Sequence, residues 1–143
     1  MADLTVSASG IVAGSNATFD FGVAGASITA GQPVYIDTAN SNVIKPAVNT
    51  SATACVVAGI ALHAAASGQP IKYIKTGDLY MTGTTLPVGS VYVLSATSGG
   101  ICPVADLEAT TGTSYCTIIG GTTVTGSTPT MRLAITVTNS LNP

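Results

Sequence analysis

Two short apolar runs flank a polar turn in the stretch Pro33-Val-Tyr-Ile-Asp-Thr-Ala-Asn-Ser-Asn-Val-Ile-Lys-Pro46. Val, Ile and Tyr favour strands, whereas Asn and Ser favour turns. The stretch therefore predicts strands over 33–37 and 42–46 that form a hairpin.

Short β-favouring runs closed by Gly, Pro, Asn or Ser continue along the rest of the chain. The 16 Gly and 7 Pro among 143 residues leave little room for the apolar stripe of a helix. We predict further strands over 55–62, 70–75, 78–82, 90–95, 100–104, 115–119 and 131–138. The Ala-rich residues 62–67 are too few for a stable helix and predict a turn or a single helical turn. The sequence thus predicts an all-β fold.

Parts of the chain repeat with an offset of 57 to 61 residues. Pro33-Val-Tyr-Ile36 recurs as Ser90-Val-Tyr-Val93, with Val34 on Val91, and Cys55-Val-Val-Ala-Gly59 matches Cys116-Thr-Ile-Ile-Gly120. Two copies are too few for a solenoid, so we expect a small barrel or sandwich built from a possible internal duplication. The predicted organisation is a single β domain over 30–143, with pseudo-repeats at about 30–82 and 87–138.

Residues 1–29 belong to neither copy and are rich in small side chains. The only two phenylalanines, Phe19 and Phe21, lie there at strand spacing, which places both rings on one face. We expect an N-terminal extended arm over 1–29 that adds a strand to another chain, with Phe19 and Phe21 as its protein-binding residues. The alternative is that both rings cover the bottom of this chain's own barrel.

The composition excludes several partners. Charged residues make up 7% of the chain, against about 25% in an ordinary domain. Four Lys plus Arg cannot assemble a basic patch for phosphates, so we expect no nucleic-acid partner. No apolar run approaches the ~18 residues of a membrane helix, and the first residues lack the features of a secretory signal. We therefore expect no membrane partner and synthesis in the cytoplasm.

No residue pattern indicates catalysis, a metal site or a cofactor. The single histidine, His63, has neither a nucleophile motif nor an orienting partner nearby in sequence and is expected in a turn or on the surface. Asp106 and Glu108 are the only close acidic pair, and the aromatic platforms of a glycosidase are scarce. The three cysteines, odd in number and widely spaced, are expected to be reduced, half-buried thiols: Cys55, Cys102 and Cys116. The sequence predicts no enzyme, no cofactor and no small-molecule substrate.

Three segments of the first copy carry turn and strand residues in a distinctive order. They are Ile28-Thr-Ala-Gly-Gln-Pro-Val-Tyr-Ile-Asp37, Val43-Ile-Lys-Pro-Ala47 and Val57-Ala-Gly-Ile-Ala-Leu-His-Ala-Ala-Ala-Ser-Gly-Gln-Pro-Ile71. Together they resemble the capsid decoration, or cement, proteins of tailed bacteriophages, best over residues 28–80. The resemblance implies a β-rich subunit, commonly a homotrimer, on the outside of the virion head. It would be made in the host cytoplasm, bind the major capsid protein and stabilise the shell.

A structural virion protein of this kind is the expected function. The alternative is a receptor- or carbohydrate-binding β module of a phage tail or fibre, which needs exposed aromatic side chains on a groove. The five tyrosines that could supply them are Tyr35, Tyr73, Tyr80, Tyr92 and Tyr115. Four of them lie in predicted strands beside Val or Ile, where packing within the sheet is the expected role.

Overall fold

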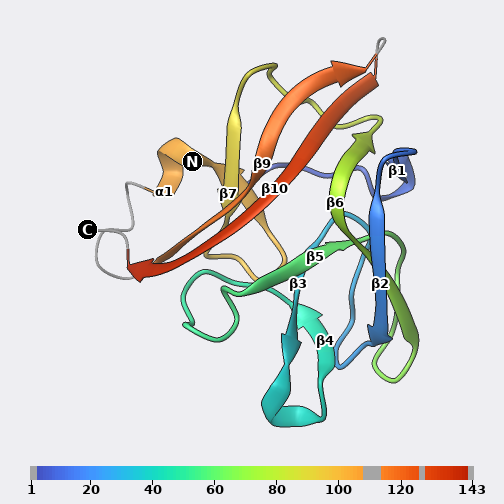
Figure 1. Ribbon diagram of the computed structural model, residues 1–143, viewed down its shortest axis with the longest axis vertical. Helices are drawn as coiled ribbons and strands as arrows, with labels where there is room; N and C mark the ends of the chain where they lie inside the picture. The colour runs from blue at the N-terminus through green and yellow to red at the C-terminus, as the bar shows by residue number, and fades with distance from the viewer. Residues whose placement is uncertain (1–2, 108–113, 126–127, 142–143) are drawn as a thin grey trace.

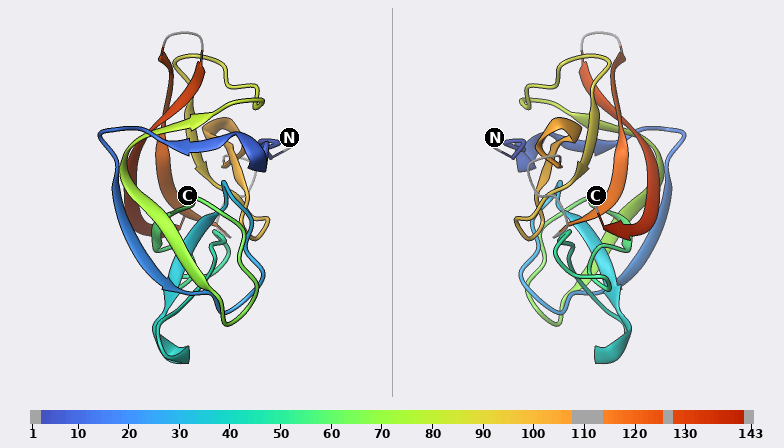
Figure 2. Two further views of the ribbon diagram at one scale, coloured as in Figure 1. Left: turned by 90° about the vertical axis from the view of Figure 1, so that its right-hand side faces the viewer. Right: turned by 90° about the vertical axis from the view of Figure 1, so that its left-hand side faces the viewer.

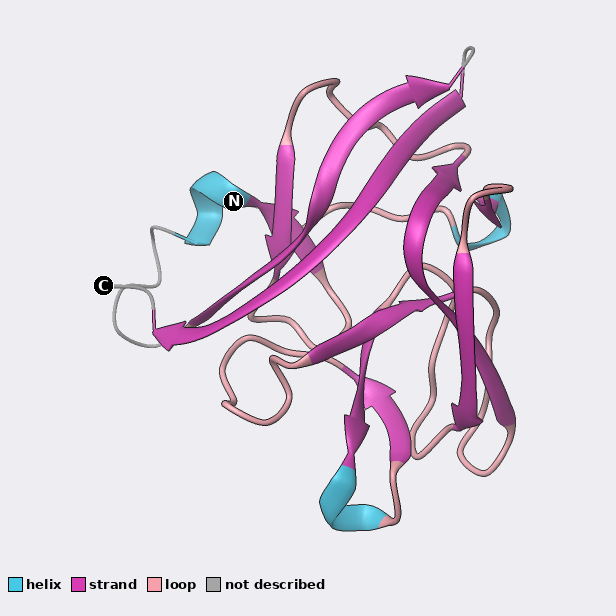
Figure 3. Ribbon diagram, viewed as in Figure 1, coloured by secondary structure: helices cyan, strands magenta, loops and turns pink. Residues whose placement is uncertain are grey.

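The computed structural model describes residues 3–107, 114–125 and 128–141. The described residues form ten strands (Figures 1 and 3): β1 (Ile11–Ala13), β2 (Thr18–Val23), β3 (Pro33–Asp37), β4 (Val43–Pro46), β5 (Val57–Ala61), β6 (Pro70–Met81), β7 (Val91–Leu94), β8 (Ile101–Pro103), β9 (Tyr115–Thr125) and β10 (Thr128–Leu141). The helical elements are short: η1 (Ala8–Gly10), η2 (Thr38–Asn40) and α1 (Val104–Leu107). The all-β prediction is confirmed. None of the helices among the described residues is long and apolar enough to cross a membrane.

Every predicted strand overlaps an observed one, but several boundaries differ. The predicted strands 70–75 and 78–82 form one continuous strand, β6. The strands predicted at 115–119 and 131–138 extend into the longer β9 and β10, which pair with each other over most of their length. Residues 62–69 form bends and turns, as predicted for the Ala-rich segment.

The strand order has an internal symmetry. Neighbours in the sheet follow the order β4-β3-β5-β6-β10-β9-β7-β8, and every strand pairing is antiparallel. When the order is followed inward from each end, β4 corresponds to β8, β3 to β7, β5 to β9 and β6 to β10. The two halves therefore share one four-strand order, whereas the internal duplication itself stays a prediction.

In one place the strand pairing of the two halves differs by one residue from the sequence alignment of the two copies. On β3, Val34 lies opposite Pro46, and on β7, Tyr92 lies opposite Pro103. Val34 therefore corresponds to Tyr92 by pairing, one residue beyond its sequence match, Val91. The sequence alignment matched the two Val-Tyr dipeptides. Hydrogen bonding between strands fixes the register independently of such local sequence identity.

Strand β6 joins the two halves. Its residues 70–76 pair with β2, and residues 73–74 also pair with β5. Its residues 77–80 pair with β10, and residues 79–81 with β1. Gly77 stands at the change of partners with φ 104°, and a Cβ there would lie 2.6 Å from the Cα of Ala17. Only glycine accommodates both the left-handed backbone and this close approach.

The first half curls around a small core. Ala24, directly after β2, bridges to Ile44 of β4, and the N–H of Gly25 donates to the Ile44 carbonyl at 2.8 Å. Strands β2, β6, β5, β3 and β4 therefore follow one another around a cluster of buried side chains: Ala24, Ile28, Val34, Ile44, Ala61, Ala65, Ile71 and Tyr73. Of the two predicted architectures, the small barrel is the closer description, since the curled sheet forms a half-barrel.

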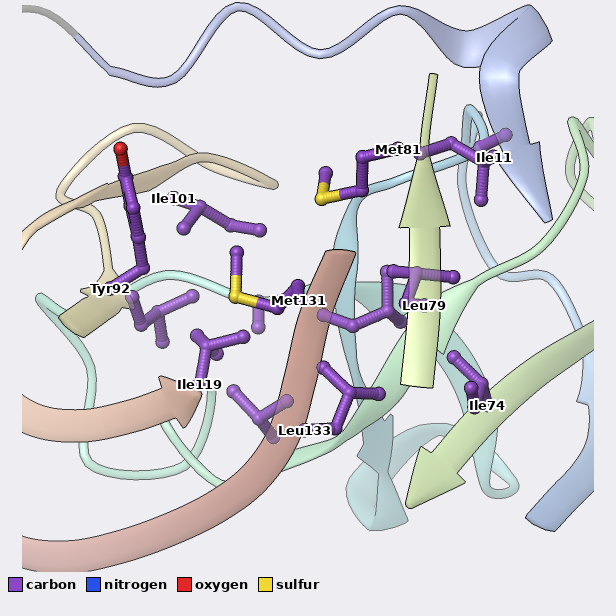
Figure 4. Close-up of a cluster of buried hydrophobic side chains, with 14 of the residues drawn as sticks. Ile11, Ile74, Leu79, Met81, Tyr92, Ile101, Ile119, Met131 and Leu133 are labelled. Atoms are coloured by element: carbon purple, nitrogen blue, oxygen red, sulfur yellow. The ribbon is translucent and has the colours of Figure 1, made fainter. Parts of the chain in front are cut away.

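A larger core lies between the second half and the outer face of the first (Figure 4). Its buried side chains include Ile74, Leu79, Met81, Tyr92, Ile119, Met131 and Leu133. The N-terminal residues cross over this core: the N–H of Leu4 donates to the carbonyl of Ile101 on β8, and β1 pairs with β6. Residues 4–13 thus connect one edge strand of the second half to the central strand.

Strands β1 and β2 both lie in the segment that the sequence sets apart as an arm. They pair with β6 of the same chain, and the side views show β2 running alongside it (Figure 2). The boundary at residue 29 between arm and domain stays a prediction.

Candidate protein-binding site

Strand β2 presents a row of exposed apolar side chains. Alternate residues of a strand share a face, and Phe19, Phe21 and Val23 are 40%, 69% and 49% exposed. On the opposite face a Cβ on Gly22 would lie 2.6 Å from the Ile44 side chain, so glycine lets β2 approach the small core. The interpretation that both phenylalanine rings cover this chain's own barrel is therefore wrong: the interior face of β2 carries glycine, and the rings point outward.

Strand β6 completes this surface. Phe21 pairs with Lys72, and Val23 pairs with the exposed Pro70. Residues directly opposite in an antiparallel pair share a face, so these side chains form one surface. We call Phe19, Phe21, Val23, Pro70 and Lys72 the β2–β6 patch.

The Lys72 ammonium lies over the two rings. Its Nζ is 4.2 Å from the centroid of the Phe19 ring and 5.6 Å from that of Phe21. A cation within about 6 Å of an aromatic face is attracted by the negative face of the ring. This contact holds the long Lys72 side chain against the aromatic row.

Two charged groups flank the patch. The N–H of Phe21 donates to Oδ1 of Asp20 at 2.8 Å, and Nζ of Lys75 lies 3.9 Å from Oδ2 of Asp20. Both side chains of the ion pair are about half exposed, at 50% and 52%. Solvent screens such a pair strongly, so it contributes little to stability.

His63 supports β6 next to the patch. The N–H of Lys72 donates to Nε2 of His63 at 3.1 Å, and Nδ1 of His63 lies 2.9 Å from the Ala64 carbonyl. These two bonds are compatible when Nδ1 carries the proton and Nε2 accepts. His63 lies in an exposed turn, as predicted, and both ring nitrogens are engaged in holding that turn to β6.

The other side chains considered for chemistry are dispersed. Asp106 lies on α1, whereas Glu108 falls outside the described residues. Across residues 3–107, 114–125 and 128–141 no group of three or more His, Cys, Asp or Glu side chains could hold a metal ion. A pocket of about 440 Å³ lies away from the patch, between the N-terminal residues, the loop after β6 and the β7–β8 pair; it is lined by Asp3, Leu4, Thr5, Gly83, Thr85, Pro87, Tyr92 and Pro103.

The three cysteines are free thiols, as predicted, but two are more buried than expected. Cys55 and Cys102 are 0% and 5% exposed, and only Cys116 is half-buried. Burial raises the pKa of the Cys102 thiol to about 11. The half-buried expectation fails for Cys55 and Cys102 because both pack in apolar clusters of the core.

The tyrosines do not form an exposed aromatic surface. Tyr73 and Tyr92 are buried, and Tyr35, Tyr80 and Tyr115 are half-buried. The chain has no Trp, so the exposed aromatic side chains of the described residues are the two phenylalanines of β2. The tyrosines therefore do not form the exposed surface that a carbohydrate-binding module would need.

The sequence identified two of the five patch residues. Phe19 and Phe21 follow from their spacing, and the same spacing would have included Val23. Pro70 and Lys72 lie about 50 residues further along the chain, and only the β2–β6 register brings them beside the rings.

The part of the chain that matches a known protein family contains the whole β2–β6 patch. No curated protein matches the chain. Residues 2–76, which are 75 of the 143 residues, match the phage cement protein family. The matched range contains β1 to β5 and residues 70–76 of β6. Because the match covers more than half of the chain, and because the fold is the all-β one that the resemblance implied, the chain belongs to the phage cement proteins, a family of structural proteins associated with the phage capsid.

Proposed function

We propose that the chain binds the outside of the phage capsid, contacts the major capsid protein and stabilises the shell. The observation that carries this proposal is the β2–β6 patch, an exposed aromatic row within the part of the chain that matches the cement family. Phe19 and Phe21 are the proposed protein-binding residues. The chain is made in the host cytoplasm in this proposal and joins the shell from outside.

The energetics of the patch favour a protein partner. Burying an exposed Phe side chain contributes roughly 1.5–3 kcal/mol at about 25 cal/mol per Å² of apolar surface. Phe21 is 69% exposed and gains little of this free energy within its own chain. A partner that covers both rings would supply the apolar centre of an interface, with the exposed hydroxyl groups of Thr18 and Thr76 in its polar rim.

We further propose that the subunit is a homotrimer. Three copies of one patch on a single particle would bind a repeating shell with high avidity even if each contact were weak. The molecular mass in solution, measured by light scattering, tests this part. A monomer at micromolar concentration would contradict it without affecting the proposed capsid contact.

The capsid contact is tested by mixing the purified chain with purified heads of the phage that encodes it. We expect co-sedimentation that saturates at a fixed number of copies per head, and a higher temperature of head disruption when the chain is bound. Heads of an unrelated phage serve as the control. Failure to co-sediment over the whole accessible concentration range would contradict the proposed function.

A further inference from the structure

We propose that the β2–β6 patch recognises a segment of its protein partner in which a carboxylate is flanked by apolar side chains, and that Lys72 contacts that carboxylate. This inference rests on the proposed function, since it names the chemistry of the partner for the same site. Three features of the molecule lead to it: the distribution of its cations, the surroundings of Lys72 and the apolar residues beside it.

The four cations of the chain are divided between two roles. Nζ of Lys45 lies 2.7 Å from Asp37, and Nε of Arg132 lies 2.9 Å from Asp78. Both of those carboxylate-bearing residues are buried, at 6% and 8% exposed, so these two cations serve the chain's own structure. The remaining two lie on β6, where Lys75 forms the exposed ion pair with Asp20 and Lys72 lies over the phenylalanine rings.

The β2–β6 surface is consequently positive on a negatively charged chain. Lys75 is offset by its neighbour Asp20, so the charge of Lys72 makes this surface positive, whereas the whole chain carries a formal net charge of −2. The positive charge that is free to meet a partner is therefore concentrated beside the exposed phenylalanines. Complementarity to such a site favours a negatively charged partner group.

Lys72 is prepared to bind one carboxylate. In the described part of the chain no carboxylate lies within 4.0 Å of its ammonium, which rests instead on the Phe19 and Phe21 rings. The rings fix the side chain and remove water from one side of the ammonium. A partner that covers the other side would place the new ion pair in a medium of lower dielectric, where Coulomb attraction is stronger than at an open surface.

The apolar residues around Lys72 restrict the kind of segment that fits. Phe21 and Val23 are 69% and 49% exposed, and Pro70 is exposed beside Val23. A purely acidic, fully hydrated surface would leave these side chains in contact with water. A segment with a carboxylate between apolar side chains would cover Phe21 and Val23 and also match the charge of Lys72.

The experiment measures binding of the full chain to heads of its own phage at low and at moderate salt. Lys72→Ala is expected to weaken binding at low salt by about tenfold or more, and Lys72→Glu more strongly still. Lys72→Arg keeps a cation that stacks on aromatic rings and is expected to restore most of the binding. The matched control is Lys75→Ala, which removes the same charge three residues away without touching the rings and should change binding by about twofold or less.

The dependence on salt separates the ionic from the apolar contribution. Binding of the wild-type chain should weaken as salt rises, and binding of Lys72→Ala should depend on salt much less. Thermal unfolding of each variant establishes that the fold is kept. Phe21→Ala is expected to weaken binding at both salt concentrations, because it removes apolar contact area rather than charge.

The outcomes distinguish this inference from the function on which it rests. If the wild-type chain does not bind heads at all, the proposed function fails. If it binds, but Lys72→Ala and Lys72→Glu bind equally well with the same salt dependence, the capsid-binding function stands and the carboxylate-recognising patch is overturned. Competition of head binding by a short DNA duplex would also overturn it, since the partner group would then be a phosphate.

Discussion

Gly59 on β5 and Gly120 on β9 occupy equivalent positions in the two halves of the molecule. A Cβ on Gly59 would lie 2.3 Å from the carbonyl oxygen of Ile74 on β6, and a Cβ on Gly120 would lie 2.2 Å from that of Arg132 on β10. Each glycine thus lets its strand cross close to the backbone of the next one. The two halves are thus alike in their strand order and in this contact.

Replacing either glycine by alanine should destabilise the fold. We expect Gly59→Ala and Gly120→Ala each to lower the free energy of unfolding by about 1–3 kcal/mol, because the backbone must shift to admit the methyl group. Gly121→Ala is the matched control, since its Cβ would approach nothing closer than the Ser90 carbonyl at 3.9 Å. Urea denaturation measures all three. Equal losses at Gly120 and Gly121 would show that close backbone approach is not the cause.

The sequence predicted those parts of the fold that depend on local pattern. The β3–β4 hairpin follows from two apolar runs around a polar turn, and the other strands follow from similar short runs closed by turn residues. The continuous β6 does not follow, because a glycine between two runs predicts a break. Gly77 stays within the strand because pairing with β2 and β5 on one side of it and with β1 and β10 on the other holds both parts extended.

The candidate site, too, was predictable only where it depends on local sequence pattern. Strand spacing placed Phe19 and Phe21 on one face, but it could not decide whether that face was buried. The decisive residue is Gly22, which contacts Ile44 on the inner side and leaves the rings outside. The sequence could not place Lys72 beside the rings, because the register between distant strands is set by tertiary pairing rather than by local sequence.

The cross-strand pair Asp78–Arg132 should make stability depend on pH. Arg132 Nε and Nη2 donate to Asp78 Oδ1 and Oδ2 at 2.9 and 3.3 Å, and these bonds hold the pKa of Asp78 below its ordinary value. A carboxyl whose pKa is lowered by folding contributes stability that is fully present above its unfolded pKa of about 3.9. This contribution is lost as the pH falls through the lower, folded value.

Arg132→Gln therefore should lower the Tm at neutral pH and reduce the further fall of Tm below about pH 4. Circular dichroism melts at a series of pH values measure both effects. Part of the acid dependence should survive in this variant, because the bond from Lys45 also lowers the pKa of Asp37. An unchanged pH profile would mean that the Arg132 contact contributes nothing to folding.

Asn49 ties the loop before β5 to the second half of the molecule. Its Nδ2 donates to the carbonyl of Leu94 at 2.9 Å, its N–H donates to Ser95, and its carbonyl accepts from the N–H of Tyr115. Asn49→Ala leaves the buried Leu94 carbonyl without this donor, so we expect a loss of about 1–3 kcal/mol in the free energy of unfolding. Ser98→Ala, at an exposed side chain, should cost well under that amount. A similar loss for both variants would contradict the proposed connection between the halves.

The thiols should react in the order set by their burial. Burial holds the pKa of Cys102 at about 11, so at pH 8 only about one thiol in a thousand is the reactive thiolate. Cys55 is fully buried, and its Sγ lies 3.4 Å from the carbonyl of Ala52. With iodoacetamide at pH 8, we expect the half-buried Cys116 to be modified first and the other two only on unfolding in urea, with mass spectrometry to locate each label. In Cys116→Ser the early label should disappear; rapid labelling of Cys102 in the folded chain would mean that the β7–β8 side of the core opens to solvent.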